Sequence, residues 1–358
     1  MEASEKEKYS IKAIIKYAGA FIAWVVGSGF ATGQEILRFF SSYGYASYFA
    51  VLFNLAGFIF VGQVILVKGY EHRREDKFNH FLFYCGKKLG AVYTWLVPAT
   101  LLLVMSALVS GAGATLSEYY GINHYIGSAI MAAMVLCAYL VGFEKLIKIL
   151  SMVGPAIIFF ILVVGLITVI TDFPHIREIG EHESELATLK PAPVWVISAI
   201  LYIPLNFLCS SPYYTALGKS AKSRKDAKWG AIAGAIVIII VVTIMNTAIL
   251  VNAGEAASLS VPTLYLAKKI SYVLGAAFSI DLILGIFSSC STMMWSFCNK
   301  FVTEGTWKNR IFAVITSVVI FIIGLFPFRE LVGIFYPIIG YIGLIFIACV
   351  IYRGVKGS

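Results

Sequence analysis

The chain alternates between long apolar runs and short polar segments along its whole length. A helix needs about 20 apolar residues to cross a bilayer, and each run has roughly that length. The pattern therefore predicts an all-α integral membrane protein with ten transmembrane helices joined by short loops. The runs cover 12–41, 45–69, 89–117, 123–143, 146–171, 192–217, 228–252, 272–298, 309–327 and 331–352.

The composition agrees with a membrane protein and excludes several other classes. Hydrophobic residues make up 59% of the chain and charged residues 13%, whereas a soluble domain averages about 45–50% and about 25%. A soluble enzyme, a disordered chain and a nucleic-acid-binding domain are therefore excluded. The six cysteines form no CxxC pair, and we interpret them as small buried side chains rather than as zinc ligands or disulfides.

The positions of lysine and arginine predict the orientation in the membrane. If the N-terminus is inside, the cytoplasmic segments hold 22 of the 28 basic residues, the external segments hold five, and Arg38 lies within the first run. By the positive-inside rule, both termini are expected in the cytoplasm, in a multi-pass protein of the plasma membrane. No cleavable signal peptide is expected, because the first apolar run lacks a small-residue cleavage site. The net charge of +9 is therefore interpreted as an orientation signal.

The two halves of the chain show a faint internal repeat. The glycine cluster GSGFATG at 27–33 corresponds to PLNFLCSSP at 204–212, and Pro155 corresponds to Pro337, 182 residues later. Five helices per half is an odd number, so the halves 12–171 and 192–352 are expected to be inverted within one transporter domain, 1–358. Inverted repeats with broken first helices are typical of transporter binding sites.

The glycines of the first run predict an unwound segment inside the membrane. Gly27, Gly29 and Gly33, with Ser28 and Thr32 between them, lower the helix propensity. Gly29 and Gly33 also fit a GxxxG motif, so close helix packing is the alternative interpretation. Unwound backbone in a bilayer must line a cavity, where its free peptide groups can hold a carboxylate or a cation.

The sixth run predicts a matching break. Pro204 and Pro212 lack amide donors and clash within a helix, although either could be a simple kink. We expect the polar substrate to lie between backbone groups around 25–29 and 205–210, with aromatic side chains as walls. The predicted substrate-binding residues are Trp24, Val25, Gly27, Ser28, Gly29, Phe30, Glu35, Tyr202, Leu205, Asn206, Cys209 and Ser210.

Three charged residues are expected inside the membrane, where such groups are costly and indicate function. Glu35 and Arg38 are three positions apart and are expected to share a helix face. A helical rise of about 1.5 Å per residue places Glu35 and Asp281 at similar depth. The three residues predict a gate, a proton site or an amine-recognition site, and the alternative is a structural ion pair.

The eighth run is rich in hydroxyl groups. Ser288, Ser289, Ser291 and Thr292 surround Cys290. Such hydroxyls often bond back to the previous helical turn, but they can also supply oxygen ligands to a hard cation such as sodium. Because positions 288 and 26 lie at similar distances from the cytoplasmic ends of their runs, a cation site between the first and eighth runs is possible.

The stretch GSGFATGQEILRFFSSYG at 27–44 resembles the first helix of the YkvI-type amino-acid permeases. These belong to the amino acid–polyamine–organocation superfamily, which has the LeuT fold, and the resemblance spans the whole chain. It implies a 5+5 inverted repeat with discontinuous helices 1 and 6. It also implies a sodium site formed by the carbonyls of Ala23, Val26 and Gly285 and the hydroxyls of Ser288 and Ser289.

These features together predict a secondary active transporter of a small amino acid or related amine, driven by sodium or protons through alternating access. The expected partners are the substrate and the lipid bilayer, with no nucleic acid and no cofactor besides the coupling ion; a monomer is sufficient. A passive channel is the alternative, although it needs a continuous polar lining. No HExxH motif or intramembrane Ser/His/Asp set is present, so an enzyme is not expected.

Overall fold

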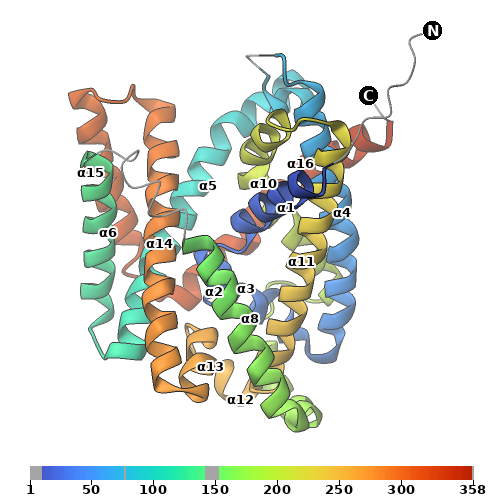
Figure 1. Cartoon of the computed structure of the whole chain (residues 1–358). Helices are drawn as coiled ribbons and strands as arrows, with labels where there is room; N and C mark the ends of the chain where they lie inside the picture. Colours follow the sequence, from blue (N-terminus) through green and yellow to red (C-terminus); the bar gives the residue numbers. More distant parts are fainter. Residues whose placement is uncertain (1–9, 76–77, 142–152, 357–358) are drawn as a thin grey trace.

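The computed structural model describes residues 10–75, 78–141 and 153–356, and within these ranges all regular structure is helical (Figure 1). The elements are α1 (Ile11–Val25), α2 (Ser28–Ala31), α3 (Gln34–Phe39), η1 (Ser41–Ala46), α4 (Ser47–Glu71), α5 (His80–Tyr120), α6 (His124–Val141), α8 (Val153–Asp172), η2 (Phe173–His182), α9 (Glu183–Ala187), α10 (Trp195–Lys219), α11 (Arg224–Leu250), α12 (Ala253–Ala256), α13 (Pro262–Ile270), α14 (Tyr272–Phe301), α15 (Trp307–Ile323) and α16 (Phe328–Lys356).

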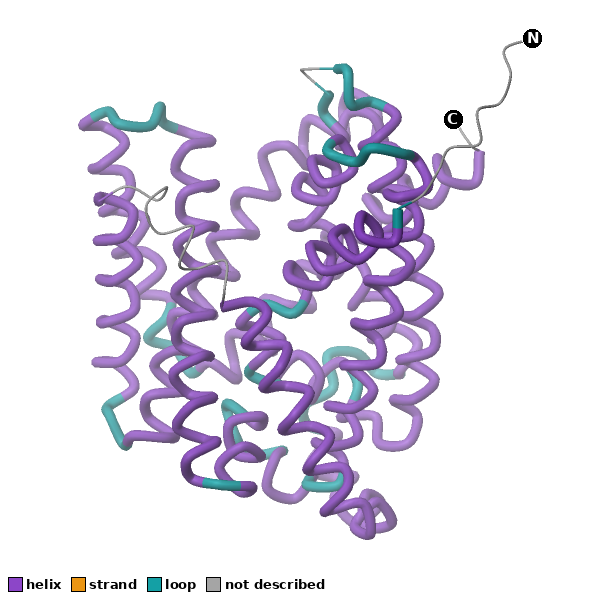
Figure 2. The backbone as a smooth tube through the Cα atoms, in the orientation of Figure 1, coloured by secondary structure: helices purple, strands orange, loops and turns teal. Residues whose placement is uncertain are grey.

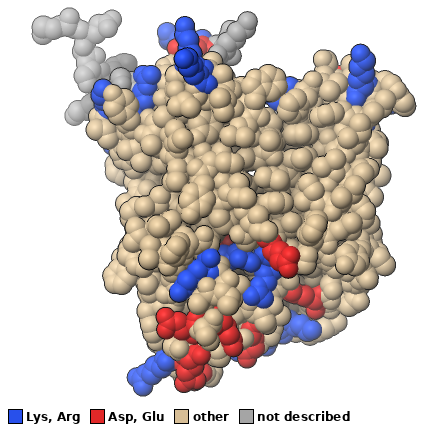
Figure 3. Space-filling view, turned by 180° about the vertical axis from the view of Figure 1, so that it is seen from behind, with Lys and Arg blue, Asp and Glu red and all other residues tan. Residues whose placement is uncertain are grey.

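Eight helical segments in the described ranges are long and apolar enough to cross a membrane. In Figure 3 the charged side chains gather toward the two ends of the molecule and leave a band of uncharged surface between them. A bilayer requires such a band, because charged side chains in its hydrocarbon core are costly. The chain is therefore a multi-pass membrane protein. The eight segments are Ser41–Glu71, His80–Tyr120, His124–Val141, Gly154–Ala187, Trp195–Lys219, Arg224–Leu250, Tyr272–Phe301 and Phe328–Lys356.

Two of the ten predicted runs contain no single helix long enough to be among these eight segments. The run 12–41 contains α1, α2 and α3, of 15, 4 and 6 residues, and the run 309–327 contains α15, of 17 residues. The beginning of the fifth run, 146–152, lies outside the described residues. A count of ten spans therefore stays a prediction.

The helices pack in two groups. In the first, α4 contacts α10 and α11, and α1 contacts α11; in the second, α5 contacts α6 and α14 (Figure 1). Helix α16 touches both groups, through α10 and α5. The crossing of α4 and α10 is very close, because a β-carbon on Gly69 or Gly218 would collide with the backbone of the other helix. The region between the two groups is where the candidate site lies.

The sixth predicted run is one uninterrupted helix, so the prediction of a discontinuous helix 6 is wrong for this structure. Helix α10 continues through both Pro204 and Pro212. Pro212 has no amide to donate to the carbonyl of Leu208, but the Ser211 hydroxyl donates to that carbonyl at 3.0 Å. Serine and threonine side chains commonly satisfy backbone groups that proline leaves free in membrane helices. The helix therefore needs no break here.

Candidate functional site

The first predicted run has interrupted backbone at the level of the glycine cluster. Helix α1 ends at Val25, the single turn α2 begins at Ser28, and α3 follows Gly33, which has a left-handed φ of 82°. Figure 2 shows the loop segments between these helices roughly midway between the two ends of the molecule. The side chain of Ser28 is outside what the structure describes.

Backbone carbonyls are left free at this interruption. The Val26 amide donates to the Ile22 carbonyl at 2.8 Å, and the Ala31 amide donates to the Gly27 carbonyl at 3.0 Å. Within the described residues, no hydrogen bond reaches the carbonyls of Ala23, Val25 or Val26. A buried peptide oxygen without a protein partner is available to a ligand or an ion.

A cavity of about 240 Å³ adjoins the free carbonyls. Residues from α1, α2, α3, α5, α10, α14 and α16 line it, so it lies between the two helix groups. It brings together most of the residues that the sequence predicts for substrate and cation binding. These are Ala23, Trp24, Val25, Gly27, Gly29, Phe30, Glu35, Leu205, Asn206, Cys209, Ser288 and Ser289.

Other lining residues were not proposed for this site from the sequence. Those on α5 are ordinary apolar residues within an apolar run, so their pattern gives no signal. Tyr336 has one available signal, because it precedes Pro337, the proline that marks the internal repeat. The additional residues are Leu101, Val104, Leu108, Met293 and Tyr336; Thr292, one of the hydroxyl residues of the eighth run, also lines the cavity.

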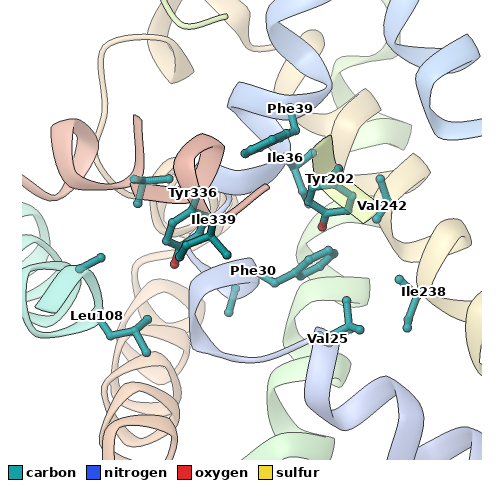
Figure 4. Packing of buried hydrophobic residues seen from close by; sticks show 14 of the residues in the cluster. Val25, Phe30, Ile36, Phe39, Leu108, Tyr202, Ile238, Val242, Tyr336 and Ile339 are labelled. Carbon is teal, nitrogen blue, oxygen red and sulfur yellow. The ribbon is translucent and has the colours of Figure 1, made fainter. Parts of the chain in front are cut away.

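Several predicted residues do not line the cavity. Val26 and Gly285 are buried in the packing beside it. The Ser210 hydroxyl donates to the Asn206 carbonyl at 2.6 Å, so its hydrogen bond lies within α10. Tyr202 is fully buried against the rings of α3 and α4, and its hydroxyl has no hydrogen-bond partner among the described residues. Figure 4 shows this hydroxyl directed toward the ring of Phe30.

Glu35 is the charged residue of the cavity lining. A β-carbon on Gly29 would lie 2.6 Å from Glu35 Oε1 and 2.9 Å from the Tyr336 hydroxyl, so both groups face this glycine. Glu35 is 9% exposed, and no ion pair or hydrogen bond joins its carboxyl group to another described residue. An unpaired carboxylate in such surroundings is unfavourable, and either a proton on the carboxyl group or a cation beside it would relieve that cost.

Arg38 and Asp281 are separate from Glu35. The Arg38 guanidinium donates to the carbonyls of Leu189 at 3.4 Å and Arg329 at 2.6 Å. Arg38 does not line the cavity, and a β-carbon on Gly333 of α16 would lie 2.5 Å from its Nη1. The expectation that Glu35 and Arg38 share a helix face stays a prediction. Asp281 is 7% exposed on α14, and its Oδ2 has no partner in the described ranges. No ion pair joins the three residues in that part of the chain, so a structural ion pair is excluded there.

The segment containing α12 and α13 covers one side of the site. The Gln34 amide donates to the Leu259 carbonyl at 2.6 Å, and the Thr263 hydroxyl donates to the Ala31 carbonyl. The Glu118 carboxylate, from the end of α5, accepts from the amides of Ser260 at 2.7 Å and Val261 at 3.1 Å. These bonds attach the segment to α2, α3 and α5, at the end of the molecule opposite the C-terminal end of α16 (Figure 1).

The other side of the cavity continues into a second cavity of about 510 Å³. The two cavities share lining residues, among them Trp24, Leu101 and Cys209. The second cavity extends to His80, at the start of α5, and to Lys300, near the end of α14. The second cavity therefore extends from the site toward the end of the molecule opposite α12 and α13.

Of the predicted cation ligands, Ser289 lies beside the interruption. A β-carbon on Gly27 would lie 3.9 Å from Ser289 Oγ and 3.5 Å from the Trp24 carbonyl oxygen. Thr292, by contrast, donates back to the Ser288 carbonyl at 2.9 Å. No group of three or more His, Cys, Asp or Glu side chains suited to a metal occurs in the described ranges. Hydroxyl and peptide oxygens are ligands that suit a hard cation better than a transition metal.

Comparison with known proteins gives relatives of nearly the same length. No protein-family model matches the sequence. The uncharacterized membrane protein YkvI of Bacillus subtilis (strain 168) is 25% identical over 350 residues, which cover 94% of each chain. The uncharacterized protein YyaD of the same organism is 22% identical over 344 residues, covering 95% of this chain and 96% of YyaD. These similarities confirm the resemblance to YkvI-type proteins.

Solved structures establish the fold. The structure of MhsT in complex with L-phenylalanine matches with a TM-score of 0.58 and 16% identity, covering 93% of this chain and 88% of MhsT. A variant of the Eremococcus coleocola manganese transporter matches with a TM-score of 0.52 and 15% identity, covering 96% of this chain and 78% of the transporter. The chain has the LeuT fold. Of these two proteins, the one from Eremococcus coleocola is named as a manganese transporter.

Proposed function

We propose that this protein is a secondary active transporter of a small amino acid or a related amine, coupled to sodium or protons. The observation that carries the proposal is the unpaired Glu35 carboxylate in a cavity at the interruption between α1 and α2. The cavity, at about 240 Å³, is smaller than the roughly 300–1,000 Å³ of pockets for drug-sized ligands. A small solute with a cationic group fits both properties.

In the proposed complex, the substrate ammonium lies near Glu35 and the free carbonyls at 23–26. A negative group on the substrate, where present, lies toward the peptide amides of the interrupted segment. Helix α10 contributes side chains rather than backbone, because the helix is continuous beside the cavity. Asn206 and Cys209 are the polar side chains that it presents to the cavity.

The proposed coupling cation is sodium, held by the carbonyls of Ala23, Val26 and Gly285 and the hydroxyls of Ser288 and Ser289. The support for this site is the free carbonyls on one side and the serines of α14 on the other. If protons drive transport instead, Glu35 is the proposed proton carrier, and Asp281 is the second acidic candidate.

The proposed transport cycle is alternating access in the plasma membrane, with both termini in the cytoplasm. The present arrangement is then inward-facing, because the second cavity leads to the end of the molecule where α16 finishes. Arg38 and the segment of α12 and α13 form the proposed outer gate. Ten spans, with a discontinuous first helix and two inverted repeats at 12–171 and 192–352, would let one helix group rock against the other within a monomer.

A thermal-shift screen of the purified protein against amino acids and amines, in sodium or potassium, tests the proposal. A ligand stabilises in proportion to its occupancy, and we expect a small cationic or zwitterionic solute to raise the melting temperature more in sodium. Uptake of that solute into proteoliposomes should saturate with concentration. A non-saturating single-channel current would instead favour a passive channel, and no shift with any amine or amino acid would contradict the proposed substrate class.

A further inference from the structure

A groove of about 760 Å³, which shares no lining residue with the substrate cavity, lies between the first turns of α5 and the last turns of α16. The groove owes its shape to a kink in α5 at Gly86, which has φ 73° and ψ −179°. A β-carbon on Gly86 would meet nothing within 4 Å, so the kink leaves open space. Two exposed lysines, Lys87 and Lys88, follow directly after it.

The groove is basic at its open end. Arg353 and Lys356, both from the last turn of α16, line it. Their charges lie 5.1 Å from the Phe83 ring and 4.4 Å from the Tyr352 ring, and neither forms an ion pair with a described residue. The groove lining contains no acidic residue.

A second observation indicates a ligand with hydrogen-bond acceptors. Tyr84 lines the same groove, is 4% exposed, and its hydroxyl has no hydrogen-bond partner among the described residues. The acid that neighbours this tyrosine, Glu71, already forms ion pairs with Lys68 at 2.9 Å and Arg224 at 3.0 Å. A buried hydroxyl donor beside two unpaired cations suits a phosphate group.

An apolar surface continues from the groove along α16. Ile345 lines the groove, and Tyr341 and Ile338 follow on the same helix face at intervals of four and three residues. All three are exposed in the band of uncharged surface, where a membrane protein meets lipid chains. A ligand that occupies the groove therefore has a polar end at Arg353 and Lys356 and an apolar end along this stripe.

We propose that this groove binds an anionic glycerophospholipid. Its phosphate contacts Arg353, Lys356 and the Tyr84 hydroxyl, and its acyl chains lie along the exposed face of α16. Basic pockets between membrane helices near one interface are known to hold acidic lipid headgroups. The inference does not depend on the proposed transport function.

Native mass spectrometry of the full-length protein tests the site with phosphatidylglycerol and phosphatidylcholine of identical acyl chains. We expect wild-type protein to retain at least about five times more phosphatidylglycerol, and the double variant Arg353→Gln, Lys356→Gln to lose this preference. The matched control is Lys308→Gln, Arg310→Gln, which removes two exposed basic residues at the start of α15 and should keep it. Equal retention of the two lipids by the wild type, or an unchanged preference in the groove variant, overturns the proposal.

Two native thiols provide a second measurement that needs no variant. Cys85 and Cys349 line the groove, whereas Cys137 is exposed on α6. In nanodiscs, phosphatidylglycerol should slow maleimide labelling of the two groove thiols at least about threefold relative to phosphatidylcholine, with labelling of Cys137 unchanged. Equal labelling in both lipids contradicts the proposal. Equal protection by glycerol 3-phosphate in detergent would show that the groove takes a soluble phosphate ester instead, which also overturns it.

Discussion

The first and sixth apolar runs look alike in sequence and differ in structure. Both contain residues that disfavour helix near their middle, a glycine cluster at 27–33 and two prolines at 204 and 212. The first run is divided into α1, α2 and α3, whereas the sixth is the single helix α10. The first run therefore supplies both the free carbonyls at 23–26 and the Glu35 carboxylate.

The difference follows from what each residue removes. A proline removes one amide, and the carbonyl that loses its partner can be satisfied by a nearby hydroxyl, as Ser211 does for Leu208. Glycines remove side chains instead, and that frees space as well as backbone conformation. Glu35 and Tyr336 occupy the space beside Gly29, and Thr263 packs against Gly33, so other parts of the chain hold the interruption open.

The largest expected effect comes from the carboxylate beside the interrupted segment. Glu35→Gln should reduce uptake of a cationic or zwitterionic substrate by about 100-fold, because loss of one partner of a buried charge pair costs about 2–5 kcal/mol. Asn206→Ala, which removes a polar lining residue from unbroken α10, should cost only a few-fold. Initial uptake rates in proteoliposomes measure both. Equal losses of uptake in the two variants would show that the first and sixth runs contribute equally to the site.

A β-carbon at the interruption should have the next largest effect. Gly29→Ala places a methyl group against Glu35 Oε1 and the Tyr336 hydroxyl, and overpacking of this kind costs about 1–3 kcal/mol. We expect uptake to fall about tenfold or more. Gly19→Ala meets nothing within 4 Å, so this control should stay within about twofold. A normal rate for Gly29→Ala would mean that the glycine is not needed for the site.

The serines of α14 should have a moderate and ion-specific effect. Ser288→Ala with Ser289→Ala should raise the sodium concentration for half-maximal stabilisation by about tenfold, which corresponds to about 1.4 kcal/mol. The melting temperature in potassium should stay unchanged. Ser291→Ala is the matched control, since Ser291 does not line the cavity. If sodium stabilises the double variant as it does the wild type, the sodium assignment is wrong and a proton at Glu35 is favoured.

The smallest effect concerns the bond that keeps α10 continuous. Ser211→Ala should lower the free energy of unfolding by about 1 kcal/mol, because it leaves the Leu208 carbonyl unpaired. In a Pro212→Ala background the loss should be smaller, since the restored amide can donate to that carbonyl. A double-mutant cycle in detergent measures this coupling. Additive effects would show that the serine does not compensate for the proline.

Much of the site was predictable because its residues break the local pattern. Glycines, a buried acid and a hydroxyl-rich stretch are conspicuous in apolar runs, and twelve of the predicted residues line the same cavity. Leu101, Val104 and Leu108 were not predictable, because apolar side chains on an apolar helix carry no mark of what they face. The position of the Arg38 guanidinium also depended on partners distant in sequence, the carbonyls of Leu189 and Arg329.

The sequence by itself determined that the chain is a helical, multi-pass membrane protein and where its helices could be interrupted. Hydropathy and residue type decide these properties, since the cost of placing polar groups in a bilayer is local. Only the tertiary structure decided which of the two candidate breaks opens, because the neighbours of each backbone group determine whether it stays satisfied. It also decided that Glu35 lines the cavity while the Arg38 guanidinium is bonded to carbonyls outside the lining, since the placement of a side chain follows from the partners that surround it.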